Sequence, residues 1–187
     1  MLQTRAAGIP GGAEDVPAPP AARRPVRRRT GARFAGAAAS GALVLAAFPP
    51  YGFWPLAPVG VALLLLTVRG CRVGTGALLG LVHGLAFFVP LLQWSGIYVG
   101  PVPWLLLAGS QAAFLAGLGA ALAAVSRGPA WPLAGALLWV AQEAVRMRLP
   151  WGGFPWGRLG FASADAPWVP LAALGGVPLV SFAVALV

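Results

Sequence analysis

The chain has 187 residues, of which 59% are hydrophobic and only 9% are charged, and its formal net charge at pH 7 is +9. Soluble globular proteins carry about 25% charged residues, so this composition cannot cover a water-facing surface and excludes that class. The single cysteine excludes an internal disulfide. An all-α integral membrane protein, a polytopic helix bundle, is the fold class that fits.

Residues 1–33 form a basic, proline-rich segment that contains seven of the 13 arginines and two acidic residues. Such a segment cannot bury a hydrophobic core, so we expect residues 1–33 to be a disordered cytoplasmic tail. Basic residues beside a first membrane helix usually set the topology and contact anionic lipid headgroups. No aromatic residue accompanies these charges, so nucleic acid is not an expected partner.

Long uncharged segments follow this tail. Residues 34–68 carry no charge and are interrupted by a Pro-Pro-Tyr-Gly turn, and residues 73–126 carry no Asp, Glu, Lys or Arg. A spanning helix needs about 20 apolar residues, and glycine and proline mark the turns between helices. The pattern predicts about six transmembrane helices, over residues 34–48, 55–69, 74–95, 102–126, 130–149 and from 169 to the last residue.

Residues 151–161, Trp-Gly-Gly-Phe-Pro-Trp-Gly-Arg-Leu-Gly-Phe, form the stretch that is least suited to a helix. We call it the GFPW loop. Glycine and proline predict turns here, and tryptophan rings favour the boundary between hydrocarbon and water. Most other tryptophans of the chain lie near predicted helix ends and suit simple interfacial anchors. Two tryptophans within six residues are more than anchoring requires, so we predict a binding role for this loop.

The arginines also predict an orientation. With a cytoplasmic N-terminus, the inside segments hold ten arginines, and the outside segments hold only Arg146, Arg148 and Arg158. This distribution agrees with the positive-inside rule. It places the turn at 49–55, the segment 96–103 and the loop at 151–168 together on the extracytoplasmic face.

Glu143 is the only acidic residue within an apolar segment. Arg146 follows at i+3, the spacing of an ion pair on one helical face, and charges inside a membrane usually face a partner or a cavity. Two interpretations stay open. The pair only stabilises the helix end, or it lines a headgroup cavity in which Arg148 and Arg158 attract phosphate.

The sequence predicts no catalytic or metal-binding role for the remaining reactive side chains. His83 has no second ligand at i±3 or i±4, so we interpret it as structural. Cys71 lies between two arginines with no acidic residue beside it, which does not favour a nucleophile. The sequence contains no P-loop, no Ser/His/Asp set and no metal-spaced cluster. We therefore expect no catalytic residue, no metal and no cofactor in this chain.

Five motifs, in order, resemble the apolipoprotein N-acyltransferase family. The GFPW loop, followed by Leu-Gly-Phe and Asp-Ala-Pro, is similar to the loop after the fifth membrane helix of that family. The other matching stretches are Ala47–Leu56, Gln93–Gly100, Trp139–Arg146 and Gly175–Phe182. Together they extend over about residues 40–187, and their order and spacing make the resemblance fairly specific.

The resemblance implies a bacterial enzyme of lipoprotein maturation in the plasma membrane. Its reaction moves an acyl chain from a phospholipid to the α-amino group of the diacylglyceryl-cysteine that begins a lipoprotein. In the family, a nitrilase-like domain after the seventh helix performs this chemistry with a Glu-Lys-Cys triad, through a thioester. The chain has no counterpart of that triad, so we expect residues 34–187 to be the incomplete membrane part, inactive alone.

The implied substrate-binding residues are Gly153, Phe154, Pro155 and Trp156, with Trp94 and Glu143 nearby. The implied partners are the phospholipid acyl donor and the lipoprotein substrate. Two other functions stay open: a membrane domain fused to a polyprenol-phosphate mannosyltransferase, and a small non-enzymatic membrane protein such as a transporter subunit. The sequence that follows residue 187 would distinguish them.

Overall fold

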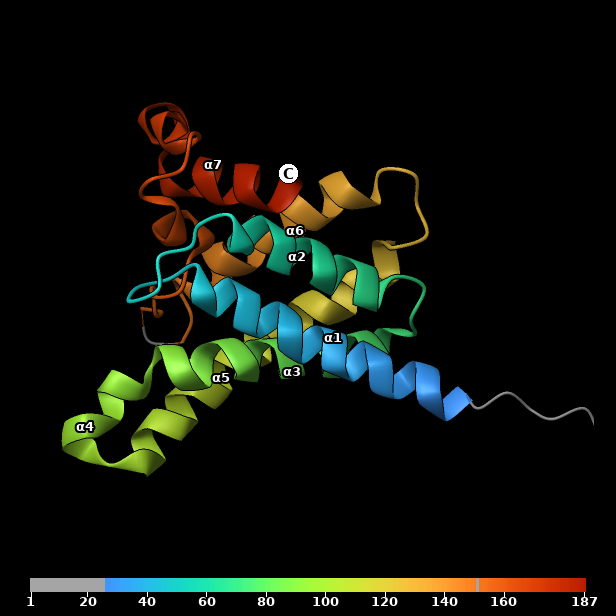
Figure 1. Ribbon diagram of the computed structural model, residues 1–187, viewed down its shortest axis with the longest axis horizontal. Helices are drawn as coiled ribbons and strands as arrows, with labels where there is room; N and C mark the ends of the chain where they lie inside the picture. Colours follow the sequence, from blue (N-terminus) through green and yellow to red (C-terminus); the bar gives the residue numbers. More distant parts are fainter. Residues whose placement is uncertain (1–25, 151) are drawn as a thin grey trace, which may run out of the picture.

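The computed structural model describes residues 26–150 and 152–187, and in these ranges it consists of helices joined by loops, without strands. Six longer helices run back and forth along the horizontal axis of Figure 1. Three short 3₁₀ segments and one short helix lie in the connections between them. The longer helices are α1 (Val26–Ala46), α2 (Leu56–Val68), α3 (Val73–Leu91), α5 (Pro101–Val125), α6 (Trp131–Arg146) and α7 (Ala172–Leu186).

The all-α membrane class predicted from composition is confirmed. Three helical segments of the described chain are long and apolar enough to cross a bilayer, Val73–Leu91, Pro101–Val125 and Val169–Leu186. Helix α2 is apolar but shorter, with 13 residues. All six predicted helices are therefore found near their expected positions, and three of them meet the length and composition of a full span.

The first helix begins earlier than predicted. Residues 26–33, which the sequence assigned to a disordered tail, form the first turns of α1. Arginine and alanine favour helix, Pro25 immediately precedes the helix, and no proline interrupts it before Pro49. The Arg33 side chain also donates a hydrogen bond to the Thr67 carbonyl of α2, at 3.2 Å. The predicted disorder of residues 1–25 lies outside the described residues.

Glycines bring α3 and α5 into the most extensive helix contact of the bundle. Gly76, Gly80 and Gly84 lie on one face of α3, and a Cβ on Gly80 would overlap the Leu115 carbonyl of α5. Gly119 of α5 meets Gly76 and Gly80 in return. Small residues at such an interface let backbones approach closely, which is how membrane helices gain packing energy without a hydrophobic effect between them.

A buried polar junction ties α1, α2 and α3 together. The Ser40 hydroxyl donates to the Gly60 carbonyl at 2.7 Å and lies 2.8 Å from His83 Nδ1. The His83 ring meets the edge of Trp139 on α6, with centroids 5.7 Å apart. His83 therefore takes part in the helix packing, and its interpretation as a purely structural residue stays a prediction.

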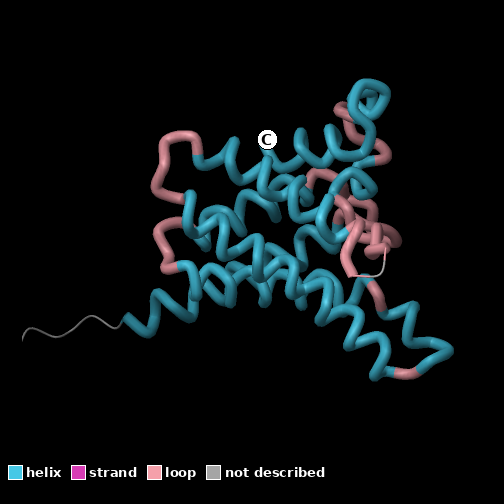
Figure 2. The backbone as a smooth tube through the Cα atoms, turned by 180° about the vertical axis from the view of Figure 1, so that it is seen from behind, coloured by secondary structure: helices cyan, strands magenta, loops and turns pink. Residues whose placement is uncertain are grey.

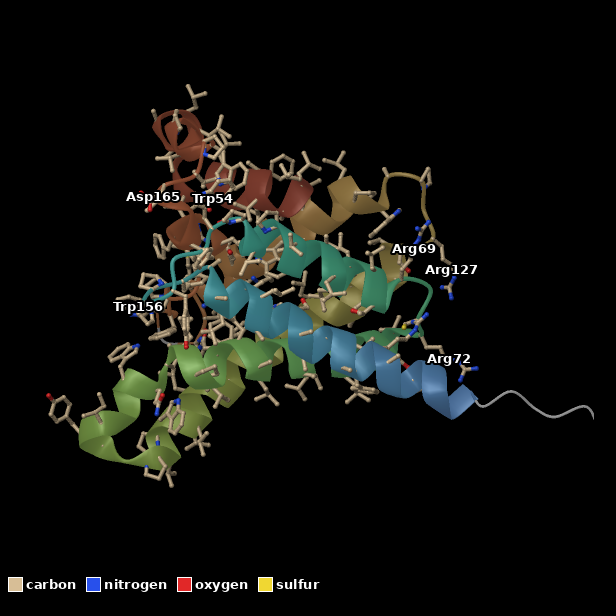
Figure 3. The ribbon with its side chains drawn as sticks, in the orientation of Figure 1. Trp54, Arg69, Arg72, Arg127, Trp156 and Asp165 are labelled. Atoms are coloured by element: carbon tan, nitrogen blue, oxygen red, sulfur yellow. The ribbon has the colours of Figure 1, made fainter. Side chains whose placement is uncertain are left out.

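The two ends of the bundle differ in composition. Figure 3 shows Arg69, Arg72 and Arg127 at one end, which we call the arginine end. The opposite, aromatic end holds the loops that follow α1, α3 and α6. Two tryptophan pairs join these loops, Trp54 with Trp168 at 5.0 Å and Trp94 with Trp156 at 5.7 Å between ring centroids. The prediction that the three loops lie together is confirmed, and their extracytoplasmic side stays a prediction.

Two connections at the aromatic end contain more helix than predicted. Helix α3 ends at Leu91, and η1 (Gln93–Ser95) and α4 (Gly96–Val99) precede α5. This α4 hairpin projects away from the bundle in both Figures 1 and 2. After η2 (Leu159–Ser163) and η3 (Val169–Leu171), α7 is interrupted by non-helical backbone at Gly175 and Gly176.

Candidate functional site

The described part of the GFPW loop folds back over the last turn of α6. Gly153 has φ of +79°, and a Cβ there would overlap the Met147 backbone, so only glycine permits this return of the chain. The Phe154 N–H then donates to the Arg146 carbonyl at 2.9 Å. The loop is thus packed directly onto the helix end that carries the charged side chains.

Arg146 binds the backbone of this loop. Its guanidinium donates to the carbonyls of Phe154, at 3.2 Å, of Trp156, and of Gly157, at 3.3 Å. It also donates to Gln111 Oε1 of α5 at 3.3 Å. Its Cζ lies 5.1 Å from the Phe88 ring centroid, in a cation–π arrangement. The side chain is 0% exposed, so one arginine satisfies several loop carbonyls inside the protein.

Glu143 binds the next part of the same loop. Its Oε1 accepts a hydrogen bond from the Leu159 N–H at 2.9 Å, and its Oε2 lies 3.4 Å from Arg158 Nε. The expected ion pair with Arg146 is therefore wrong: the recorded pair is Glu143–Arg158. The helical spacing put Arg146 within range, but Arg146 is occupied by loop carbonyls. Arg158, 6% exposed, supplies the countercharge from the loop.

A pocket opens beside the loop at the aromatic end. We call it the tryptophan pocket. Its volume is about 300 Å³, and residues from the loops after α1, α3 and α6 form it: Phe48, Pro49, Leu91, Leu92, Trp94, Trp156, Gly157 and Phe161. A second hollow of about 490 Å³ adjoins it and shares Pro49, Leu91 and Trp94. The lining of the tryptophan pocket is mostly apolar, which suits hydrocarbon better than a charged headgroup.

The predicted binding residues separate into two groups. Trp94 and Trp156 are half exposed, at 51% and 54%, and both line the tryptophan pocket. Phe154 is partly buried against the core, and Pro155 is exposed. Glu143 is fully buried and holds the loop, so its carboxylate is not at the pocket surface.

The two arginines that were expected to attract phosphate, Arg148 and Arg158, lie in different environments. Arg148 is exposed and donates to the Ala144 carbonyl at 2.7 Å. Arg158 faces inward to Glu143, so the expectation that its guanidinium attracts phosphate is wrong in this structure. Trp151 lies outside the described residues. Cys71 is buried at the arginine end, where Arg33 Nη1 contacts its sulfur, and it takes no part in the pocket.

Several residues that build the site were not predicted from the sequence. Gln111 and Phe88 are the partners of Arg146 from α5 and α3, and Phe48 and Phe161 complete the pocket wall. A polar Gln111 in an otherwise uncharged segment was a usable signal, because a polar group inside a membrane needs a partner. Over the two described ranges, no group of three or more His, Cys, Asp and Glu side chains could hold a metal ion.

Comparison with known proteins gives consistent matches over most of the chain. Residues 40–187 match the family described as the apolipoprotein N-acyltransferase N-terminal domain. The chain is similar to the apolipoprotein N-acyltransferase of Mycolicibacterium smegmatis, with 41% identity over 156 residues, which covers 81% of this chain and 26% of the relative. The corresponding enzyme of Pseudomonas syringae is 36% identical over 172 residues, covering 80% and 32%.

A third relative, the apolipoprotein N-acyltransferase of Photobacterium profundum, is 31% identical over 163 residues, which covers 79% of this chain and 31% of the relative. The chain thus spans about a quarter to a third of the length of these curated relatives.

Proposed function

This chain belongs to the apolipoprotein N-acyltransferase family, and we propose that it forms the membrane part of an enzyme that acylates bacterial lipoproteins. The acyl donor is a phospholipid, and the acceptor is the α-amino group of an N-terminal diacylglyceryl-cysteine. In this reaction the acyl carbonyl leaves the lipid oxygen for an enzyme thiol and then passes to the amine. The thiol belongs to the nitrilase-like domain of the family, and this chain supplies the lipid-binding surface.

The tryptophan pocket is the observation that carries this proposal. Both reactants are lipids, and the transferred group is a hydrocarbon chain that needs an apolar place near headgroup depth. Each buried methylene contributes about 0.8 kcal/mol, so an apolar pocket can hold such a chain without any charged contact. The pocket lies at the end of the bundle where the tryptophans gather, as they do at membrane interfaces.

Within the proposed site, each predicted residue has a stated role. Trp94 and Trp156 form the walls that contact the acyl chain. Gly153, Phe154 and Pro155 give the loop the path that presents Trp156 to the pocket. Glu143 does not contact the acyl chain; it binds the loop backbone at Leu159.

We further propose that the chain is a multi-pass protein of the bacterial plasma membrane with a cytoplasmic N-terminus. The arginine end then faces the cytoplasm, because positive charge is retained there. The aromatic end faces the outside, where the diacylglyceryl-cysteine of an exported lipoprotein lies.

The test uses the full-length enzyme with Trp156→Ala and, separately, Phe154→Ala. Loss of a large aromatic contact should reduce the rate of lipoprotein acylation by about tenfold or more, measured by the mobility shift of an acylated lipoprotein substrate. Trp131→Ala, the same substitution at the arginine end, is the matched control and should keep normal activity. Normal activity in both Trp156→Ala and Phe154→Ala would contradict the proposed site.

A further inference from the structure

Two charged side chains of α6 bind the backbone of four residues within the loop stretch 154–159. Arg146 donates to the carbonyls of residues 154, 156 and 157, and Glu143 accepts from the N–H of Leu159. The two residues stand one helical turn apart, and each meets the backbone groups of opposite polarity. We call this pair and the backbone that it binds the loop clamp.

The hydrogen bonds of the loop clamp form because backbone groups inside a membrane protein need partners. An irregular segment at membrane depth must have its N–H and C=O groups paired within the protein. This need alone does not explain which carbonyls Arg146 selects. The three carbonyls belong to Phe154, Trp156 and Gly157. The bonds therefore fix the backbone of Trp156 and of residues close to it, and the Trp156 ring forms a wall of the tryptophan pocket.

The Trp156 ring is 54% exposed, and it pairs with the Trp94 ring, which is also half exposed. The Gly157 backbone lines the pocket while its carbonyl accepts from Arg146 Nη2. The position of this pocket wall therefore depends on the backbone beneath the ring, and that backbone is held by the clamp.

We infer that Arg146, assisted by Glu143, is a positioning residue that fixes Trp156 as a preformed wall of the tryptophan pocket. Arg146 is 0% exposed and is not among the residues that line the pocket, so it acts through the loop. The inference rests on the proposed function for its link to acylation, while the geometry of the clamp can be tested without it. A preformed wall lowers the cost of binding, because the loop loses no conformational freedom when the acyl chain enters.

Arginine is required at this position for a chemical reason. A planar guanidinium has five N–H donors in a fixed fork, whereas a lysine ammonium is a compact point charge with three rotatable donors. Arg146 Nη1 faces the Phe154 and Trp156 carbonyls and Gln111 Oε1, and Nη2 faces the Gly157 carbonyl, whereas Nε has no partner in the described chain. Arg146→Lys keeps the charge but puts one nitrogen in place of these two, so it cannot meet both acceptor positions and should behave like Arg146→Gln and not like the natural protein.

The tryptophan pairs of the aromatic end provide a matched measurement. In the 187-residue chain in lipid nanodiscs, Cys71→Ser removes the natural cysteine. One sample then carries Trp94→Cys with Trp156→Cys, and the control sample carries Trp54→Cys with Trp168→Cys. The two native pairs have similar ring separations, 5.7 and 5.0 Å, but only the first depends on the clamp. A short bifunctional thiol reagent reports the yield of each cross-link.

Arg146→Gln and Arg146→Lys should each lower the 94–156 yield by about tenfold, the effect of losing hydrogen bonds to a charged group. The 54–168 yield should stay within twofold of the parent, and Arg127→Gln, at the arginine end, should change neither. An unchanged 94–156 yield overturns the inference. An equal fall in both yields also overturns it, because the role would then be general stability. If Arg146→Gln does not accumulate, Arg146→Lys, which keeps the charge, is judged alone by the same criteria.

A parallel arm links the clamp to acylation in the full-length enzyme. Arg146→Lys should reduce the acylation rate about as much as Trp156→Ala does, and Arg127→Gln should not. Normal acylation by Arg146→Lys, with the 94–156 cross-link lost, overturns the positioning role. If Trp156→Ala itself acylates normally, the proposed function fails, and the cross-link yields still decide whether the clamp fixes the loop.

Discussion

The two ends of the bundle use the same residue type in opposite ways. At the arginine end, Arg69, Arg72 and Arg127 are exposed. Arg69 stacks over Trp131 at 4.9 Å, and Arg127 donates one long bond of 3.5 Å to the Gly70 carbonyl. At the aromatic end, Arg146 and Arg158 are buried and bound to the loop and to Glu143. The exposed arginines thus give one end of the bundle its positive charge, whereas the buried arginines hold the loop of the other end in place.

The difference follows from the cost of removing charge from water. An exposed guanidinium keeps its hydration, so its contacts contribute little to stability. A buried charge pays a large desolvation penalty that only well-placed partners offset, and removing one partner leaves the other uncompensated. Changes that leave a buried arginine of the aromatic end without its partner should therefore destabilise the protein much more than changes to the exposed arginines of the arginine end.

The largest effect should come from Glu143→Ala. It leaves Arg158 buried without its countercharge and the Leu159 N–H without an acceptor. Breaking a buried pair in this way costs about 3–5 kcal/mol, which should appear as a lower free energy of unfolding in a denaturant titration in mild detergent. Asp165→Ala is the control, because Asp165 is exposed at the same end. Equal stability of the two variants would contradict the comparison.

A middle-sized effect is expected from Gly80→Ala, which disturbs the helix contact that joins the two ends. The added methyl group would overlap the Leu115 carbonyl, and overpacking of this kind costs about 1–3 kcal/mol. Gly117→Ala on α5 is the matched control, since nothing lies within 4 Å of its Cβ position. It should be neutral or slightly stabilising in the same titration, because alanine favours helix over glycine. A neutral Gly80→Ala would mean that the α3–α5 contact is looser than described.

Arg69→Gln should have a smaller effect, although it also removes an arginine. The loss is one cation–π contact with Trp131 at an exposed site, which is worth no more than about 1 kcal/mol. The free energy of unfolding, measured as for Glu143→Ala, should therefore change only slightly. A loss as large as that of Glu143→Ala would remove the distinction between the two ends.

The smallest effect on the protein, and the sharpest test of orientation, comes from single-cysteine labelling. With Cys71→Ser, Arg72→Cys marks the arginine end and Asp165→Cys the aromatic end, and both native residues are exposed. An impermeant maleimide added to intact cells should label residue 165 and should reach residue 72 only after the membrane is opened. The reverse pattern would invert the proposed topology.

Local sequence signals predicted the helices and the grouping of the loops. The uncharged segments, the Pro-Pro-Tyr-Gly turn and the arginines at 69, 72 and 127 were enough to place six helices within a few residues, apart from the start of α1. The positive-inside count then predicted that the three loops share one end, and the Trp94–Trp156 and Trp54–Trp168 contacts confirm it. These features depend on hydrophobic length and charge, which can be counted along the chain.

The partners inside the site could not be predicted in the same way. The i+3 spacing identified Arg146 as the partner of Glu143, but periodicity describes only one helix. The return of the GFPW loop over α6 decides the pairing, and this path depends on the left-handed backbone at Gly153 and on space beside Met147. Gln111 and Phe88 are likewise distant in the sequence from Arg146, and only the packing of three helices brings them to it.

The polar junction between the first three helices has a consequence for the imidazole ring at its centre. Ser40 has a single hydroxyl hydrogen, and the Gly60 carbonyl accepts it. The contact with His83 then uses a ring hydrogen on Nδ1, so in the neutral ring Nε2 carries a lone pair, and Nε2 has no partner in the described chain. The Ser40 hydroxyl thus determines the tautomer of the ring. In Ser40→Ala the ring could adopt either tautomer, and nitrogen-15 spectra of the imidazole would record the change.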